Sequence, residues 1–271
     1  MIRFAFFVDG SNLFGSLKGM ALEVPDYQKF FDHLYRSAES QWRSTTGASA
    51  GVLTVLQRVY WYQVGSIDQW NLDDAQAQAV LKERFDESKQ IKAGYMSAAG
   101  KANAGKPQTD VALKAWSLCF EEFKAWYEGK KAILAGMKRF HHGVQTSTDL
   151  IDILEIGHWK VDFFNHSCEE KGLDTRLAVD MVALEENYDV AVVISGDADS
   201  IPSIDLMKRR GKHVGAVEFV RGYPPEKKGK GFSSKIKLSA DFVCRIYEME
   251  LASKKLAAKP AQKSHAQKGA E

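Results

Sequence analysis

The chain has 271 residues, of which 45% are hydrophobic, and its 37 Lys and Arg face 35 Asp and Glu. This length allows one large domain or two small ones, and the formal charge of +2 neither demands nor excludes a nucleic acid as partner. The three cysteines lie far apart without a CxxC pair, which argues against a disulfide framework or a zinc site and favours a reducing, cytoplasmic compartment. No segment approaches the ~20 apolar residues that cross a bilayer, and the N-terminal apolar run is too short for a signal peptide, so no membrane is expected.

The first predicted elements are a buried strand, a turn, a helix and a second strand. The strand covers residues 2–8, and Gly10, Ser11 and Asn12 follow it as a turn. Asp26 is the predicted N-cap of a helix, because apolar residues recur at helical spacing from Tyr27 onward. The second strand is predicted over residues 52–64.

Residues from about 72 to 137 are rich in Ala, Lys, Glu, Gln and Trp and predict a helical insertion. Two helices are expected, over 73–91 and 109–137, with a mobile loop at 97–107. The aromatic residues of the second helix have the spacing of a packed core rather than of a base-stacking surface. They are Trp116, Phe120, Phe123, Trp126 and Tyr127. His141 and His142 are expected at the surface.

After the insertion, strands and helices alternate again. Strands are predicted over 159–164, 189–195 and 213–220, and helices over 174–188, 200–211 and 239–255. This alternation predicts an α/β fold with an open, mainly parallel sheet and helices on both faces. We expect one domain over 1–252 that includes the insertion, followed by a disordered basic tail at 253–271.

Aspartates end two of the predicted strands. Asp9 ends the first, and Asp197 and Asp199 follow the valine-rich strand. If these strands are neighbours, the three carboxylates meet at the carboxyl edge of the sheet, where open α/β sheets bind ligands. Asp174, at the start of the helix predicted over 174–188, can approach the same edge from the side. Asp180 lies about 120° further around that helix. Crowded carboxylates repel one another unless a cation neutralises them, and oxygen ligands favour Mg²⁺ or Mn²⁺. The implied chemistry is hydrolysis of a phosphate ester.

The same residues resemble a known family. The segments "FFVDGSNLFGSL" and "EEKGLDTRLAVDMVALEENYDVAVVISGDADSIPSIDLMKRRGKHVGAV" resemble the NYN domain, including its LabA-like members, within the PIN-like superfamily of metal-dependent nucleases. The resemblance implies a PIN-like, Rossmann-like three-layer fold and a nuclease acting on single-stranded or structured RNA. It also implies metal ligands at Asp9, Asp174, Asp197 and Asp199, with Asn12 orienting a ligand or water and Ser195 supporting the site. The sequence departs from the family pattern at Ser200, where an aromatic residue is usual, and in the size of the insertion.

Several interpretations stay open at this stage. Asp180 is either part of the site or a partner of Lys171 or Arg176. A basic loop that includes Lys227, Lys228 and Lys230 is either a phosphate contact or a solvated charge run. A phosphatase of the haloacid dehalogenase type is disfavoured, because that family carries its D-x-D after the first strand. A non-catalytic regulatory or RNA-binding module with this fold is the main alternative to a nuclease, and a homo-oligomer is compatible with either.

Overall fold

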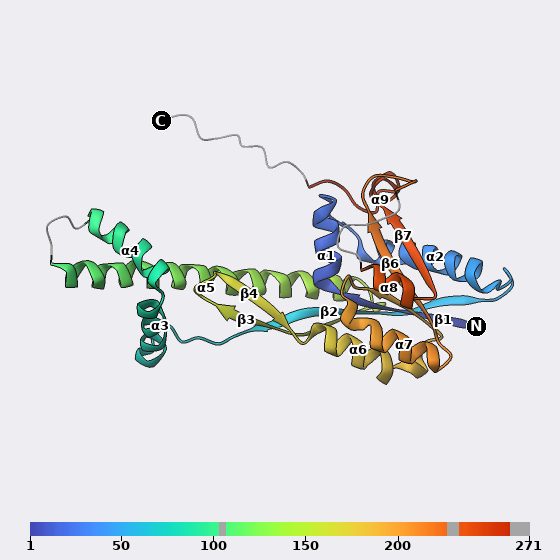
Figure 1. Ribbon diagram of the computed structural model, residues 1–271. Helices are drawn as coiled ribbons and strands as arrows, with labels where there is room; N and C mark the ends of the chain where they lie inside the picture. Colours follow the sequence, from blue (N-terminus) through green and yellow to red (C-terminus); the bar gives the residue numbers. More distant parts are fainter. Residues whose placement is uncertain (103–106, 227–232, 261–271) are drawn as a thin grey trace, which may run out of the picture. The chain divides into compact units, whose positions relative to one another are not determined.

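The computed structural model describes residues 1–102, 107–226 and 233–260. Strands and helices alternate along most of the chain (Figure 1). The strands are β1 Ile2–Asp9, β2 Thr54–Ile67, β3 Ile151–Asp162, β4 Ser167–Lys171, β5 Val190–Ile194, β6 His213–Val220 and β7 Phe242–Tyr247. The α-helices are α1 Gly10–Gly19, α2 Tyr27–Thr46, α3 Ala75–Glu87, α4 Lys89–Ala102, α5 Gln108–Ser147, α6 Leu173–Ala183, α7 Ile201–Arg209, α8 Ser234–Ser239 and α9 Glu248–Ser253. Short 3₁₀ turns cover Glu185–Asn187 and Ala198–Ser200.

The strands form one sheet in the order β4-β3-β2-β1-β5-β6-β7. Neighbours from β2 through β1, β5 and β6 to β7 are parallel, and β3 and β4 form an antiparallel pair. This confirms the predicted open, mainly parallel sheet. The first strand and the valine-rich strand are neighbours, which is the condition for their aspartates to meet at one edge. No helix in the described residues is both long enough and apolar enough to cross a bilayer.

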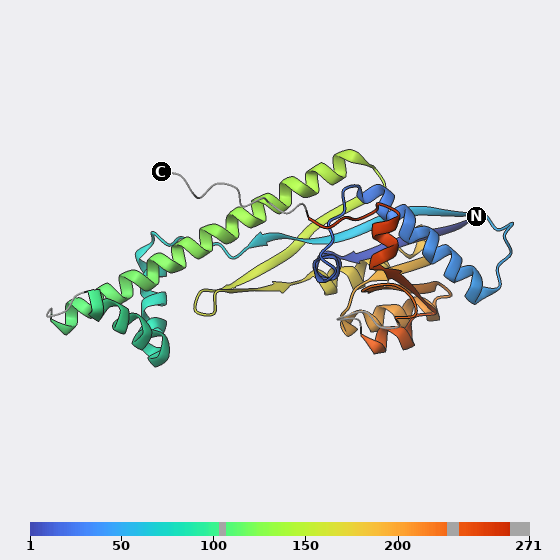
Figure 2. The same ribbon diagram turned by 90° about the horizontal axis from the view of Figure 1, so that it is seen from above.

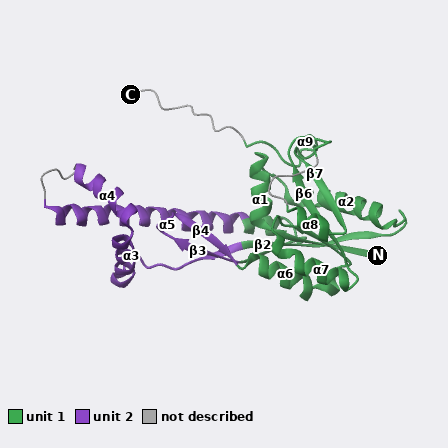
Figure 3. Cartoon of the chain, viewed as in Figure 1, with its two compact units in different colours: residues 1–63, 141–156, 172–271 green, residues 64–140, 157–171 purple. Residues whose placement is uncertain are grey.

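The chain divides into two compact units (Figure 3). Unit 1 consists of residues 1–63, 141–156 and 172–271, and unit 2 of residues 64–140 and 157–171. The helices α3 and α4 and most of α5 belong to unit 2, so the helical insertion expected from the sequence is present. Unit 1 holds every aspartate proposed for the metal site.

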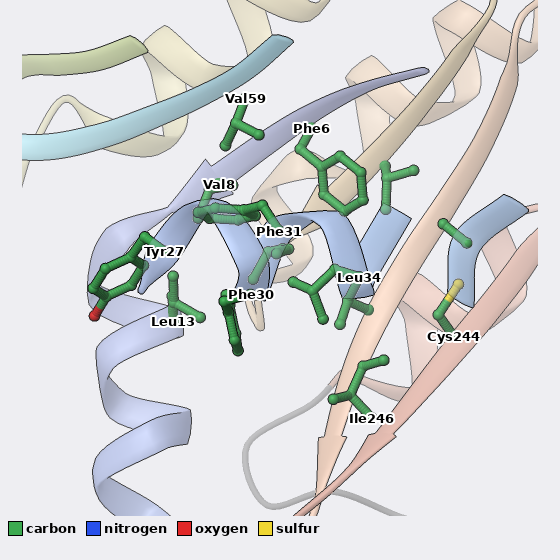
Figure 4. Packing of buried hydrophobic residues seen from close by; sticks show 14 of the residues in the cluster. Phe6, Val8, Leu13, Tyr27, Phe30, Phe31, Leu34, Val59, Cys244 and Ile246 are labelled. Carbon is green, nitrogen blue, oxygen red and sulfur yellow. The ribbon is translucent and has the colours of Figure 1, made fainter. Parts of the chain in front are cut away.

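Helices cover both faces of the sheet in unit 1 (Figures 1 and 2). Alternate residues of β1 point to opposite faces, and Phe4, Phe6 and Val8 pack with α1, α2 and α9 in one core cluster. Figure 4 shows part of this cluster, where Phe30, Phe31 and Leu34 of α2 lie beneath Phe6 and Val8. The helices α6 and α7 cover the other face. This gives three layers, with β1 and β5 buried on both sides.

The local signals for α2 and for the valine-rich strand are confirmed. Asp26 accepts a hydrogen bond from the backbone amide of Lys29 and caps α2, which ends at Gly47 with a φ of 71°. All residues of β5 are buried, as a strand covered by helices on both faces requires.

Aromatic residues form the core of unit 2. The rings of Trp70, Phe123, Trp126 and Tyr127 surround Phe163, with centroid distances of 5.3–5.9 Å. The Tyr127 hydroxyl donates to the backbone carbonyl of Asp68 at 2.7 Å. Phe120, Phe123 and Tyr127 are buried, which confirms their predicted core role, whereas Trp116 and Trp126 are partly exposed.

The predicted final helix over 239–255 is wrong for its first half. Residues Phe242–Tyr247 form β7, and only Glu248–Ser253 is helical, as α9. Phe242, Cys244 and Ile246 are buried while their neighbours are more exposed, so burial alternates with a period of two. Pairing with β6 satisfies the backbone of this segment as a strand.

The turn predicted at Gly10, Ser11 and Asn12 is the start of α1, because Asp9 caps a helix there. The loop predicted at 97–107 is helical through Ala102, where α4 ends, and residues 103–106 lie outside the described residues. The helix expected over 73–91 is divided at Ser88 between α3 and α4. The expected strand at 159–164 is the end of the longer β3, and β4 was not predicted.

Two surface expectations also differ from the structure. His141 is 1% exposed and its Nδ1 lies 2.8 Å from Glu155 Oε1, so it is not a surface residue, whereas His142 is exposed. The start of the expected basic tail is ordered: Glu23 and Ala258 form a β-bridge, and Ala257 is buried. Residues 261–271 lie outside the described residues.

Gly215 makes a close contact that a larger residue cannot keep. An added Cβ would lie 2.2 Å from Cε2 of Phe242 on the neighbouring strand. We expect Gly215→Ala to lower the free energy of unfolding by about 1–3 kcal/mol, because the buried ring has to move. Urea denaturation measures the loss, and Gly143→Ala on exposed α5 backbone is the control, since its Cβ meets nothing within 4 Å. Equal stability of Gly215→Ala and the wild type would contradict the packing described here.

Candidate active site

β1 and β5 end side by side at the carboxyl edge of the sheet. Val8 pairs with Ile194, the last residue of β5, so Asp9 and Ser195 follow paired positions. On the other side of β1, Tyr62 of β2 is the partner of Asp9. Because β2 and β5 lie on opposite sides of β1, the strand order reverses there, and open α/β sheets bind ligands at such a point.

Asp9 caps helix α1 and is 5% exposed. One carboxylate oxygen accepts the backbone N–H of Asn12 at 3.1 Å, and the other accepts the side-chain amide of Asn12. The Asn12 Oδ1 in turn accepts the backbone N–H of Gly196 at 2.9 Å. Asn12 therefore joins the carboxylate at the end of β1 to the loop that follows β5.

The loop after β5 is shaped by its own polar atoms. Ser195 is buried, and its Oγ accepts the backbone N–H of Asp197 at 3.1 Å. The Asp197 carboxylate accepts the backbone N–H of Asp199 at 3.2 Å, and its carbonyl accepts the Ser200 hydroxyl at 3.0 Å. Asp197 and Asp199 are exposed at this turn. Ser200 is buried, and its hydroxyl closes the turn.

Asp174 lies in the first turn of α6, just after Gly172, whose φ is 86°. Burial, together with the charges of Asp9, Asp197 and Asp199, raises the pKa of Asp174 to about 6. Asp9, Asp197 and Asp199 are thus each within electrostatic reach of Asp174, although the four carboxylates come from three separate segments of the chain. The positive end of α6 offsets part of the repulsion.

Asp180, further along α6, pairs with Arg176, one of the two partners expected for it. It is 7% exposed, and Arg176 Nε donates to its Oδ1 at 2.8 Å. Burial and the nearby charge of Asp180 raise the pKa of Tyr62, which is the strand partner of Asp9. Tyr62 was missed from the sequence, because only the register between β1 and β2 places it here.

The donor chemistry of the cluster suits a hard divalent cation. No group of three or more His, Cys, Asp and Glu side chains among the described residues is placed as the ligand shell of one metal ion. Mg²⁺ is usually held by one or two carboxylates, several waters and the phosphates of a substrate, rather than by a cage of protein ligands. Asp174 with three carboxylates within electrostatic reach of it fits that mode of binding.

The structure gives no support for a phosphate contact by the lysines of the basic loop. Lys227, Lys228 and Lys230 lie outside the described residues. Lys237, further along the same segment, pairs with the buried Glu218 at 2.7 Å. Glu218 also accepts from Arg245 at 3.2 Å, so Lys237 neutralises a buried charge of β6.

These features define an α/β protein with an acidic cluster at the switch point of a parallel sheet. The NYN domain family model matches residues 129–245, which include Asp174, Asp197 and Asp199. This match agrees with the resemblance to the NYN domain that the sequence shows, and the NYN family belongs to the PIN-like nuclease superfamily. Asp9 and Asn12 precede the matched segment, and the chain brings them to the site through the pairing of β1 with β5.

No curated protein matches the sequence. Among solved structures, the chain is similar to a protein of unknown function from Vibrio parahaemolyticus, with 13% sequence identity and a TM-score of 0.43. That similarity covers 90% of this chain and 93% of the other.

The Asn12 amide is the donor that faces the Asp9 carboxylate, so its replacement by a carboxylate is informative. We expect Asn12→Asp to lower the free energy of unfolding at pH 8 by about 1–3 kcal/mol, because a hydrogen bond becomes a like-charge contact. Asn187→Asp, on an exposed 3₁₀ turn, is the matched control. Urea denaturation of both variants measures the effect. Equal losses in the two would show that the contact with Asp9 does not stabilise the fold.

Proposed function

We propose that this protein is a metal-dependent nuclease that hydrolyses phosphodiester bonds of RNA. The observation that carries the proposal is that paired β1 and β5 end in Asp9 and in the loop of Asp197 and Asp199 at the switch point of the sheet, and the charges of these three residues contribute to the raised pKa of Asp174. Such a concentration of negative charge suits a divalent cation and, with it, a phosphate. The NYN domain supports nuclease chemistry, and RNA as the substrate comes from the resemblance to that family.

In this proposal Asp9, Asp174, Asp197 and Asp199 hold Mg²⁺ or Mn²⁺, directly or through water. The ion would supply an activated water and stabilise charge on the phosphate oxygens. Asp197 and Asp199, the exposed pair, face the arriving strand, and Asp199 is either a second ligand or the group that holds the attacking water. Asn12 and Ser195 are positioning residues, since their contacts fix Asp9 and the loop after β5.

A second candidate function is a non-catalytic regulatory or RNA-binding module. One observation favours it: both oxygens of Asp9 accept hydrogen bonds from Asn12, so Asp9 has a sufficient structural role as the cap of α1. A cap and a ligand are compatible roles, because each carboxylate oxygen can accept more than one partner. Only a measurement of activity separates the two functions.

The test uses the purified full chain with end-labelled single-stranded RNA and with DNA of the same sequence. Each substrate is incubated with Mn²⁺, with Mg²⁺ or with EDTA, and the products are separated on a denaturing gel. We expect cleavage of RNA with either metal and none in EDTA. Cleavage that persists in EDTA, or cleavage of DNA alone, would contradict the proposal. Binding of RNA without cleavage under any condition would favour the regulatory module.

A further inference from the structure

A cavity of about 410 Å³ opens at the carboxyl ends of β5 and β6, next to the acidic cluster. Its walls come from α1, from the end of β5 with the first residues of its loop, and from β6. All of these segments belong to unit 1. The volume lies in the range of roughly 300–1,000 Å³ that small-ligand sites occupy.

The cavity and the acidic cluster share part of their framework. Asn12, Ser195 and Gly196 line the cavity, and the same residues connect Asp9 with the loop that carries Asp197. A molecule in the cavity would therefore lie directly beside the carboxylates. A strand that crosses the sheet edge could place one phosphate at the cluster and a neighbouring nucleotide in the cavity.

The chemistry of the cavity is opposite to that of the cluster. Among the residues that the structure describes, none that lines the cavity is acidic, and the one charged residue of the lining is Arg221, just after β6. Arg221 is exposed and makes no ion pair with another residue in the part of the chain that the structure describes. Phe219 and Met20 supply apolar surface, and Ser16 supplies a hydroxyl. A lining that combines apolar surface with a guanidinium suits a base joined to a phosphate.

Two glycines of α1 keep the cavity open. Gly15 and Gly19 are one helical turn apart and both line it, and a Cβ added to either would meet nothing within 4 Å. Packing therefore does not require glycine at these positions, although each glycine inside a helix costs about 0.5–1 kcal/mol relative to alanine. Space for a ligand is the feature that a larger side chain would remove.

We infer that this cavity binds one nucleotide of the RNA strand, next to the phosphodiester that the acidic cluster cleaves. The base lies against Phe219 and Met20, and Arg221 contacts the phosphate. This inference rests on the proposed function for its substrate class, but its test measures binding without cleavage.

The test measures binding of uridine and adenosine monophosphates by calorimetry, and of a short single-stranded RNA by fluorescence anisotropy, all in EDTA. Gly15→Phe fills the cavity, and Gly129→Phe on exposed α5 is its control, since a Cβ there also meets nothing within 4 Å. Arg221→Gln removes the guanidinium, and Arg209→Gln at the exposed end of α7 is its control. We expect Gly15→Phe and Arg221→Gln each to weaken binding of the monophosphates about tenfold, and each control to change it less than about twofold.

The outcomes separate the cavity from the nuclease proposal. If the wild type binds no monophosphate, or if neither Gly15→Phe nor Arg221→Gln weakens the binding, the inference is overturned. The Arg221→Gln variant decides the matter if Gly15→Phe loses its native circular dichroism spectrum. Binding that these variants weaken, in a protein that cleaves nothing with any metal, would support the cavity and reject the nuclease. If Gly15→Phe and Arg221→Gln change neither the cleavage of RNA nor the binding of the monophosphates, the nuclease proposal is supported and the cavity is rejected.

Discussion

Asp197→Asn is expected to lower RNA cleavage by about a hundredfold or more, which corresponds to about 3 kcal/mol in the activation barrier. Asparagine keeps the shape of the side chain and an oxygen that can accept the N–H of Asp199, so the turn after β5 should persist. The change removes one negative charge from the cluster, and the cation that the proposal requires is then held less well. Binding of RNA in EDTA should survive or become tighter, because a charge that repels phosphate is gone.

Asp205→Asn is the matched control for this variant. Asp205 lies on α7, eight residues further on, and is partly exposed. Cleavage is compared under single-turnover conditions with Mn²⁺, and binding is compared in EDTA. Equal cleavage by the wild type and Asp197→Asn would mean that the activity is a contaminant or arises elsewhere in the chain. Binding without cleavage in all three proteins would favour the regulatory module.

The sequence predicted which strands end in aspartates, and the strand order in the structure places those ends side by side. The valine-rich run predicted a strand covered on both faces, and β5 is buried throughout. A pair of such strands with aspartates at their ends predicts convergence only if the strands are neighbours, and β1 and β5 are paired. The electrostatic coupling of Asp174 to the other carboxylates agrees with that reasoning. Their service as metal ligands is still a prediction.

The errors arose where one sequence pattern supports two structures. "FVCRIY" before "EMEL" reads as a continuous helix, but its alternating burial and its pairing with β6 make it β7. Gly10, Ser11 and Asn12 are turn residues by composition, yet α1 begins at Gly10 because Asp9 is already its cap. Asp9 is both the last residue of β1 and the N-cap of α1, so no turn separates the strand from the helix.

The parts of the site that depend on strand register could not be read from the sequence. Tyr62 faces Asp9 only because β2 pairs with β1, and Arg221 borders the cavity only because β6 lies next to β5. One signal was available: Gln63 is a polar residue within an apolar strand, and it is 1% exposed. An added Cβ on Gly10 would lie 2.2 Å from its Nε2, so the Gln63 side chain occupies the space beside the glycine that follows Asp9.

The charge of Asp174 is expected to cost the fold stability at neutral pH. Burial and the three neighbouring carboxylates raise its pKa from 3.8 to about 6. A carboxyl group whose pKa is higher in the folded state contributes stability that is fully present below the unfolded pKa and is lost as the pH rises through the folded pKa. Above about pH 6 the charged group therefore destabilises the protein, and this cost should fade as the pH falls toward 4.

We therefore expect Asp174→Asn to raise the free energy of unfolding in EDTA at pH 8 by about 1–2 kcal/mol, a figure reduced for screening because the side chain is half-buried. Near pH 4 the variant and the wild type should be about equally stable. Urea denaturation at both pH values measures the difference, with Asp205→Asn as the control. Added Mn²⁺ should stabilise the wild type more than Asp174→Asn, because a ligand that binds only the folded state raises its stability. A variant that is less stable than the wild type at pH 8 in EDTA would show that attractive contacts hold this carboxylate, and a metal would then not be needed to explain the cluster.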